Sequence, residues 1–257
     1  AVVIVIAAAV FFATREKATP PAKADVVIGM TLEPPGLDPT TGAAAAIGEI
    51  THDNIYEGLT KINENGSVSP LLAESWTISP DLKTYTFKLL KGVKFQDGEP
   101  FSSADVKFSF ERNAAEGSTN KRKATFANFD KIETLDADTV VITLKKTNPD
   151  LLFNLGENTA VIVDPKSAAG NATHPIGTGP FKFDNWVKGS SVTLVKWDGY
   201  RNAAAIKLSK VTFRIINDPA AQVAALLAGD VDAIPRFGAS ESLSQFEKDP
   251  RFTVTVG

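Results

Sequence analysis

The most informative stretch of the chain reads Leu72-Ala73-Glu74-Ser75-Trp76, then Ser79-Pro80-Asp81-Leu82-Lys83-Thr84-Tyr85-Thr86-Phe87-Lys88-Leu89, then Lys91-Gly92-Val93-Lys94-Phe95-Gln96-Asp97-Gly98. From Thr84 to Leu89, aromatic and aliphatic residues alternate with polar ones, which predicts a strand with one buried and one solvated face. Val93 and Phe95 repeat this pattern before a turn at Asp97-Gly98. We therefore expect a sheet here with an apolar inner face.

Downstream of this stretch, a helix and a further strand are predicted. Ser102 and Asp105 have the spacing of a helix-capping pair, and the helix that they begin places Val106 and Phe110 on one face. Alternation returns from Thr139 to Leu144, which predicts another half-buried strand.

The last third of the chain indicates the fold class. Phe181–Val187 and Val192–Trp197 flank Lys188-Gly189 and predict a hairpin. After it come a strand at Val211–Ile215, a helix that begins at Pro219 and ends at Gly229, and a strand at Val231–Ile234. A strand-helix-strand order implies a parallel pair, so the sequence predicts an α/β fold.

The region before the informative stretch reads as strand, loop and helix. Asp25–Thr31 is a predicted buried strand, and the loop from Leu32 to Pro39 contains two adjacent prolines and a glycine, which exclude helix and sheet. An alanine-rich helix is expected from about Ala43 to Glu57, with Gly58 as its stop.

The first residues are typical of an export signal. Ala1–Ala13 is an unbroken apolar run, too short for a membrane span, and Ala22-Lys23-Ala24 has the small-x-small form of a cleavage site before Asp25. We expect residues 1–24 to be a signal peptide, with an uncleaved N-terminal anchor or a buried core strand as the alternatives. The first two place the remainder at the periplasmic or extracellular face of the cytoplasmic membrane.

Composition and motifs exclude several classes of function. The 257 residues carry a formal net charge of −3, which argues against a nucleic-acid binder, and there is no cysteine. His52 and His174 are too far apart to suggest a metal pair. Ser118-Thr119-Asn120-Lys121 has the S-x-x-K form of serine enzymes that recognise penicillin, but S-D-N and K-T-G are missing. We expect no catalytic residue, metal or cofactor.

The informative stretch resembles the signature of the family 5 bacterial extracellular solute-binding proteins, the dipeptide and oligopeptide receptors of ABC importers. Other matching segments are Glu33–Pro39, Ser103–Phe110, Gly177–Phe181 and Gly229–Asp232, so the resemblance spans about 25–257. Leu82 stands where glycine is usual, which affects the expected turn type. The resemblance implies an α/β, type 2 periplasmic-binding-protein-like fold in which this chain stops before the second lobe.

The resemblance also implies an organisation and a function. Residues 25–50 and 172–257 would form one discontinuous α/β subdomain, and 51–171 an inserted β-rich subdomain. The protein would be a monomer that binds peptides in a cleft closed by hinge motion and delivers them to ABC permease subunits. The alternatives are the same fold with a nickel chelate, an oligosaccharide or an opine as ligand, a ligand-sensing domain, and, least favoured, a serine hydrolase.

Candidate ligand contacts follow from the rule that ligands meet loops at the carboxyl ends of strands. The loop Leu32-Glu33-Pro34 follows the first strand, and its glutamate matches an acidic ligand contact of some relatives. Arg236 and Phe237 follow the strand that ends at Ile234. Phe126 is a candidate from the other subdomain. The alternatives are an exposed Glu33, a surface ion pair for Arg236 and a core position for Phe126.

Overall fold

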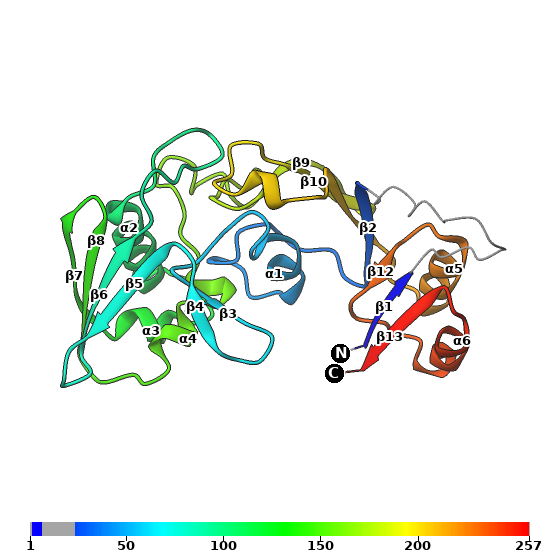
Figure 1. Cartoon of the computed structure of the whole chain (residues 1–257), viewed down its shortest axis with the longest axis horizontal. Coiled ribbons are helices and arrows are strands. Elements are labelled where there is room, and N and C mark those ends of the chain that lie inside the picture. The colour runs from blue at the N-terminus through cyan, green and yellow to red at the C-terminus, as the bar shows by residue number, and fades with distance from the viewer. Residues whose placement is uncertain (1, 7–23, 257) are drawn as a thin grey trace, which may run out of the picture. The chain divides into compact units, whose positions relative to one another are not determined.

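The computed structural model describes residues 2–6 and 24–256, and the chain divides into two compact units (Figure 1). Unit 1 comprises Ala1–Glu33, Asp184–Lys196 and Ala204–Gly257. Unit 2 comprises Pro34–Phe183 and Trp197–Ala203. The subdomain limits given above, 25–50 with 172–257 and 51–171, stay a prediction.

Unit 1 holds most of a seven-stranded sheet with the order β13-β1-β12-β2-β11-β10-β9. Its strands are β1 (Val2–Ile6), β2 (Asp25–Met30), β9 (Phe181–Val187), β10 (Ser191–Lys196), β11 (Lys210–Ile215), β12 (Ala233–Ile234) and β13 (Phe252–Val256). β11 and β12 both run parallel to β2, which lies between them. The predicted parallel orientation of the strands before and after α5, β11 and β12, is confirmed, and β2 lies between them.

The last predicted strand is shorter than expected, because Val231 and Asp232 precede β12 instead of belonging to it. The Asp232 carboxylate accepts the Val27 N–H at 2.7 Å, and the Asp232 N–H donates to the Val27 carbonyl at 2.7 Å. The Asp232 side chain therefore accepts the Val27 N–H, which a main-chain carbonyl would have accepted if β12 were longer.

Helices α5 (Pro219–Ala228) and α6 (Leu243–Lys248) pack on the sheet of unit 1. Asp218 caps α5 by accepting the Ala221 N–H at 2.7 Å, and Gly229 ends it with φ 76°. Both predicted limits of this helix are confirmed. The core that the helices close with the strands consists of Ile216, Ala225, Leu226, Val231, Ile234, Phe246 and Phe252.

The N-terminal strand β1 pairs antiparallel with β12 and β13. Most of the expected leader, residues 7–23, lies outside the described residues, so the export signal stays a prediction. Among the described residues, no helix combines the length and the apolar character needed to cross a membrane.

Unit 2 contains an antiparallel sheet with the order β5-β6-β8-β7 and a small β3-β4 pair. Its strands are β3 (Thr60–Ile62), β4 (Val68–Pro70), β5 (Ala73–Ile78), β6 (Thr84–Leu89), β7 (Phe129–Asp136) and β8 (Thr139–Leu144). Its helices are α1 (Ala45–Thr51), α2 (Ser103–Ala114), α3 (Lys123–Ala127) and α4 (Leu151–Asn154). The predicted strands at Thr84–Leu89 and Thr139–Leu144 are confirmed and pair with each other.

The inner face of this sheet packs against α2, and the alternation correctly predicted that one face of β6 is buried. Tyr85, Phe87 and Leu89 are all buried. Val93 and Phe95 are buried as well, although Lys94 forms only an isolated bridge with Pro100 and no strand.

The cap of α2 forms as its sequence indicated. The Asp105 carboxylate accepts the Ser102 backbone N–H at 2.7 Å and the Ser102 hydroxyl at 3.0 Å. Val106 and Phe110 on this helix are then fully buried. The cap fixes where α2 begins and so sets which face of the helix each of its residues occupies.

The expected helix from Ala43 to Glu57 is wrong in length, because α1 ends at Thr51. Asp53 has φ 58°, and the carbonyls of Asn54 and Ile55 accept the N–H groups of Phe181 and Gly179 at 2.9 and 2.8 Å. A longer helix would use those carbonyls internally. Tertiary hydrogen bonding thus ends the helix before residues 52–57.

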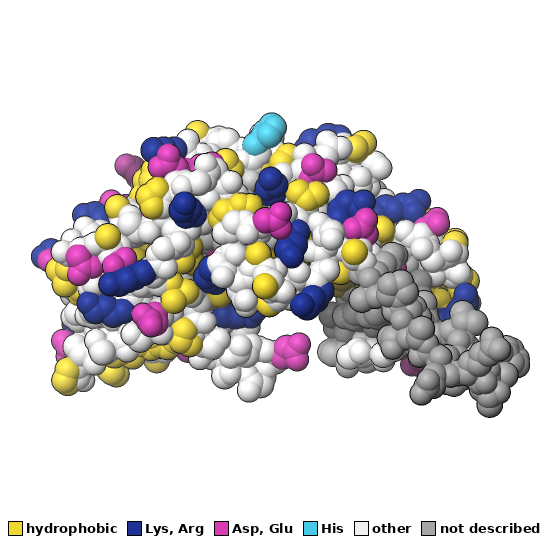
Figure 2. All heavy atoms as spheres, turned by 45° about the horizontal axis from the view of Figure 1, so that its top comes forward, with side chains coloured by type: hydrophobic (Ala, Val, Ile, Leu, Met, Phe, Trp, Pro, Cys, Tyr) yellow, Lys and Arg dark blue, Asp and Glu magenta, His cyan; other side chains and the backbone are white. Residues whose placement is uncertain are grey.

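The surface carries charges of both signs. On the face drawn in Figure 2, basic and acidic side chains are interspersed, consistent with a formal net charge of −3. This face therefore has none of the single-sign character that nucleic-acid binding requires.

Candidate functional site

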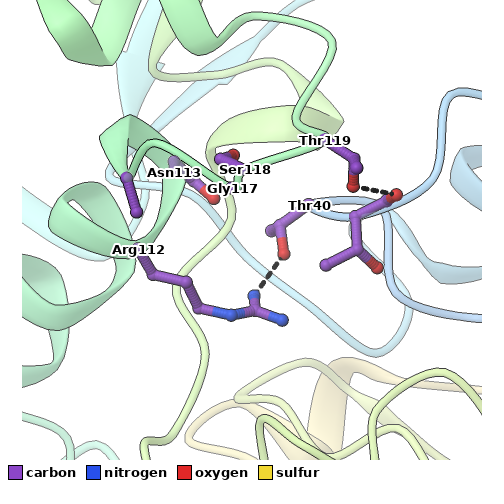
Figure 3. Close-up of a pocket in the computed structure, with 8 residues that line it drawn as sticks. Thr40, Arg112, Asn113, Gly117, Ser118 and Thr119 are labelled. Carbon is purple, nitrogen blue, oxygen red and sulfur yellow. Dashed lines mark hydrogen bonds between the residues drawn. The ribbon is translucent and has the colours of Figure 1, made fainter.

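A polar pocket in unit 2 is the candidate site, with a volume of about 250 Å³ (Figure 3). It forms where the loop before α1, the C-terminal end of α2 and the loop after α2 meet. Its lining residues are Thr40, Thr41, Arg112, Asn113, Ala115, Gly117, Ser118 and Thr119.

A buried carboxylate organises one wall of the pocket. Asp38 accepts the backbone N–H and the hydroxyl of Thr40 at 2.9 and 2.6 Å. Its second oxygen accepts from the Arg112 guanidinium at 2.9 Å, and Arg112 also donates to the Thr40 hydroxyl. The Asp38 side chain is 2 % exposed and that of Arg112 is 25 % exposed. The pocket therefore contains the Arg112 cation, and the buried Asp38 carboxylate neutralises its charge.

Two asparagines and a threonine hold the opposite wall, the loop after α2. Asn113 and Asn120 both donate to the Thr159 carbonyl, at 3.3 and 2.9 Å. Thr119 donates its hydroxyl proton to the Thr41 carbonyl at 2.7 Å, which joins the two loops across the pocket (Figure 3). These contacts connect segments far apart in sequence, so the pocket is a product of the folded unit.

The residues that line the pocket offer hydrogen-bonding groups. No histidine or cysteine lines it, and Ser118 accepts the Asn120 N–H at 3.2 Å as part of a local turn. Lys121, the partner of Ser118 in the S-x-x-K pattern, is not a lining residue. In the described part of the chain, no cluster of three or more histidine, cysteine or acidic residues could hold a metal ion. Hydroxyl, amide and guanidinium groups suit recognition of a polar solute.

Tyr56, which is completely buried, lies close enough to Asp38 and Arg112 to feel their charges. Burial raises the pKa of its phenol well above the ordinary value, and the negative charge of Asp38 acts in the same direction. The phenol is therefore neutral and contributes no charge to the pocket.

The first predicted contact loop, in unit 1, is occupied by internal bonds. Glu33 accepts the Trp186 indole N–H and the Gly189 N–H, both at 2.9 Å, so it braces the β9–β10 hairpin. The Gly189 N–H holds the pKa of the Glu33 carboxyl below its usual value. Leu32 is 67 % exposed. Pro34 is buried and begins unit 2.

The second predicted loop lies beside the first. The Thr31 hydroxyl donates to the Arg236 carbonyl at 3.4 Å, so the ends of β2 and β12 come together as expected for parallel neighbours. Phe237 packs edge-on against Phe246, with ring centroids 5.4 Å apart. The assignment of Leu32, Glu33, Pro34, Arg236 and Phe237 to ligand binding stays a prediction.

Phe126 is a core residue. It is 1 % exposed and its ring lies 5.4 Å from that of Phe110 and 5.7 Å from that of Phe129, centroid to centroid. The core position that the sequence left open for it is the one the structure adopts. A side chain buried to this extent offers no surface to a solute.

Sequence reasoning missed most of the pocket. Arg112 and Asn113 sit inside a predicted helix and carry no local sign of function. The polar run Gly117-Ser118-Thr119-Asn120 was the available signal, because a polar loop after a capped helix is a common site of recognition. Ser118 drew attention only as a nucleophile, a chemistry for which the pocket has no partner.

Comparison with known proteins identifies the class. The family model for bacterial extracellular solute-binding proteins, family 5 (middle region), matches residues 67–256, and the chain belongs to this family. The fold is that of a type 2 periplasmic binding protein, as predicted. The family is a class of solute receptors.

Individual relatives include both peptide and non-peptide binders. The glutathione-binding protein GsiB of Escherichia coli O157:H7 is 33 % identical over 215 residues, covering 80 % of this chain and 41 % of GsiB. The binding protein AgaA of A. tumefaciens R10, solved with agropinic acid, has a TM-score of 0.82 at 33 % identity, covering 88 % and 46 %. The periplasmic binding protein DppA of Helicobacter pylori, solved with the peptide STSA, has a TM-score of 0.78 at 29 % identity, covering 88 % and 49 %. The chain thus spans less than half of each relative.

Proposed function

We propose that this chain is part of an extracytoplasmic receptor of an ABC importer, which binds peptides and passes them to a membrane permease without chemical change. The observation that carries the proposal is the pocket of unit 2, whose only charged lining group, Arg112, is neutralised by Asp38. Such a pocket suits neutral groups that donate and accept hydrogen bonds, as peptide amides do. Membership in the family supplies the transport context.

Main-chain groups that closely follow the pocket-lining Thr41 in sequence support a peptide ligand. Ala43 is exposed, and among the described residues its N–H and C=O have no hydrogen-bond partner. Ala44 is in extended conformation, with φ −70° and ψ 130°. An extended peptide can pair with free main-chain groups of this kind irrespective of its side chains. In the whole protein, a second lobe would close over the solute.

A second candidate is a non-peptide solute such as agropinic acid, favoured by the likeness to AgaA. Titration calorimetry on the whole protein with tri-L-alanine, glutathione and agropinic acid distinguishes the two. Binding of tri-L-alanine or glutathione, with the peptide recovered intact by mass spectrometry, supports the proposal. Binding of agropinic acid alone refutes the peptide assignment, and hydrolysis that Ser118→Ala abolishes refutes the receptor function.

The pocket itself is tested by removing one hydroxyl. Thr119→Val deletes the hydroxyl that donates to the Thr41 carbonyl at the rim, and its matched control is Thr77→Val on the exposed side of β5. We expect Thr119→Val to weaken peptide binding by about 1 kcal/mol, because the two loops of the pocket lose the hydrogen bond that joins them, and the control to leave binding unchanged. Equal affinities in both variants would show that the solute binds elsewhere.

A further inference from the structure

One buried amide in unit 1 has a position that the function above leaves unexplained. Gln222 lies on α5 and is 0 % exposed. Its amide nitrogen donates to the Thr31 hydroxyl at 3.1 Å and to the Ile216 carbonyl at 2.9 Å. Its amide oxygen accepts the Gly238 N–H at 3.2 Å. Both protons and the carbonyl of this side chain are thus in use.

The partners of Gln222 come from three different loops. Thr31 directly follows β2, Ile216 directly follows β11, and Gly238 lies in the loop after β12. These strands are neighbours in the order β12-β2-β11, and the outer two run parallel to β2. A single side chain therefore joins the loops at the carboxyl ends of three adjacent parallel strands.

The link extends one step further, because the Thr31 hydroxyl that accepts from Gln222 donates in turn to the Arg236 carbonyl. Loops 31–33 and 236–238 are thereby fixed to each other as well as to α5. In open α/β sheets, loops at this edge are where ligands bind.

We propose that Gln222 is a positioning residue, which sets the geometry in which loops 31–33 and 236–238 meet the solute. The identity of what these loops bind rests on the proposed receptor function. The bracing itself does not, because it follows from the three hydrogen bonds. Methionine has a similar volume and none of these polar groups, so Gln222→Met would leave the Gly238 N–H and the Ile216 carbonyl without their partner.

The test compares Gln222→Met with Gln245→Met, the same substitution at an exposed position of α6. Amide hydrogen exchange should rise at least about fivefold in 31–33 and 236–238 of Gln222→Met, and stay unchanged in the β9–β10 hairpin. The affinity for tri-L-alanine should fall about tenfold, because the two loops are no longer held in the geometry that meets the peptide. Gln245→Met should match the wild type in both measurements.

A milder variant keeps the inference testable if Gln222→Met does not fold. Thr31→Val removes only the link through Thr31, so exchange should rise in 31–33 while the Gly238 N–H stays protected. Unchanged exchange in both loops would overturn the inference, as would faster exchange with unaltered affinity for tri-L-alanine. If the wild type does not bind tri-L-alanine, the peptide assignment fails, and the exchange data alone decide whether Gln222 braces the loops.

Discussion

Replacement of Arg112 by methionine is the sharpest test of how the pocket is built. The substitution keeps the aliphatic stem and removes the cation that faces Asp38, whose side chain is only 2 % exposed. Asp38 would retain its two bonds from Thr40 but would remain as a buried, uncompensated carboxylate. Breaking a fully buried pair costs about 3–5 kcal/mol. Since the Arg112 side chain is 25 % exposed and water can reach it, we expect a loss of about 2–3 kcal/mol.

Urea unfolding followed by tryptophan fluorescence measures this loss, with Arg122→Met as the matched control. Arg122 pairs with Glu157 at the surface, where the two side chains are 50 % and 18 % exposed, and its loss should cost less than about 1 kcal/mol. Adding Asp38→Asn to Arg112→Met should recover part of the stability, because the buried charge then disappears. Equal losses in the two arginine variants would refute the reasoning.

Three further substitutions have defined outcomes. Burial and the adjacent Glu57 carboxylate raise the pKa of Tyr200 from 10.0 to about 12. The stability that this shift contributes is present below pH 10 and is lost as the pH rises through about 12. Tyr200→Phe should therefore flatten the alkaline decline of the unfolding free energy. Leu82→Gly should raise the free energy of unfolding in urea by about 1 kcal/mol, because Leu82 is 53 % exposed and has a left-handed φ of 59°, which costs energy for leucine. An unaltered urea midpoint would contradict this. Gly177→Ala should cost about 2–3 kcal/mol in the same assay, since its Cβ would lie 2.1 Å from the Ile55 carbonyl oxygen, and full stability would show that the two segments can separate.

The glycine usually found at the position of Leu82 illustrates how sequence and structure complement each other. Its replacement by leucine raised a question about the turn type, and the structure places Leu82 in a left-handed backbone conformation, with φ 59°, that leucine adopts at a cost. The turn is held in place because the two strands that flank it, β5 and β6, pair with each other.

Local signals were sufficient for much of the fold. The alternation at Thr84–Leu89, the Ser102–Asp105 cap, and the Pro219 and Gly229 limits of α5 each involve residues within a few positions of one another. Such signals act through backbone geometry and nearest neighbours, which the sequence displays directly. The family resemblance rests on these same segments, and the α/β class and the receptor family were therefore predicted correctly.

The candidate site and the hydrogen bonds of Gln222 depended on contacts that no local pattern contains. Arg112 reaches Asp38 across 74 positions, Thr119 reaches Thr41 across 78, and Gln222 reaches Thr31 across 191. Because each bond joins chemically ordinary residues from distant segments, neither spacing nor periodicity reveals it. The sequence by itself determined the strands at Thr84–Leu89 and Thr139–Leu144, the caps of α2 and α5, and the family of this protein. Only the tertiary structure decided that α1 ends at Thr51, that Phe126 belongs to the core, and which side chains line the pocket, because burial and long-range hydrogen bonds exist only once the chain has folded.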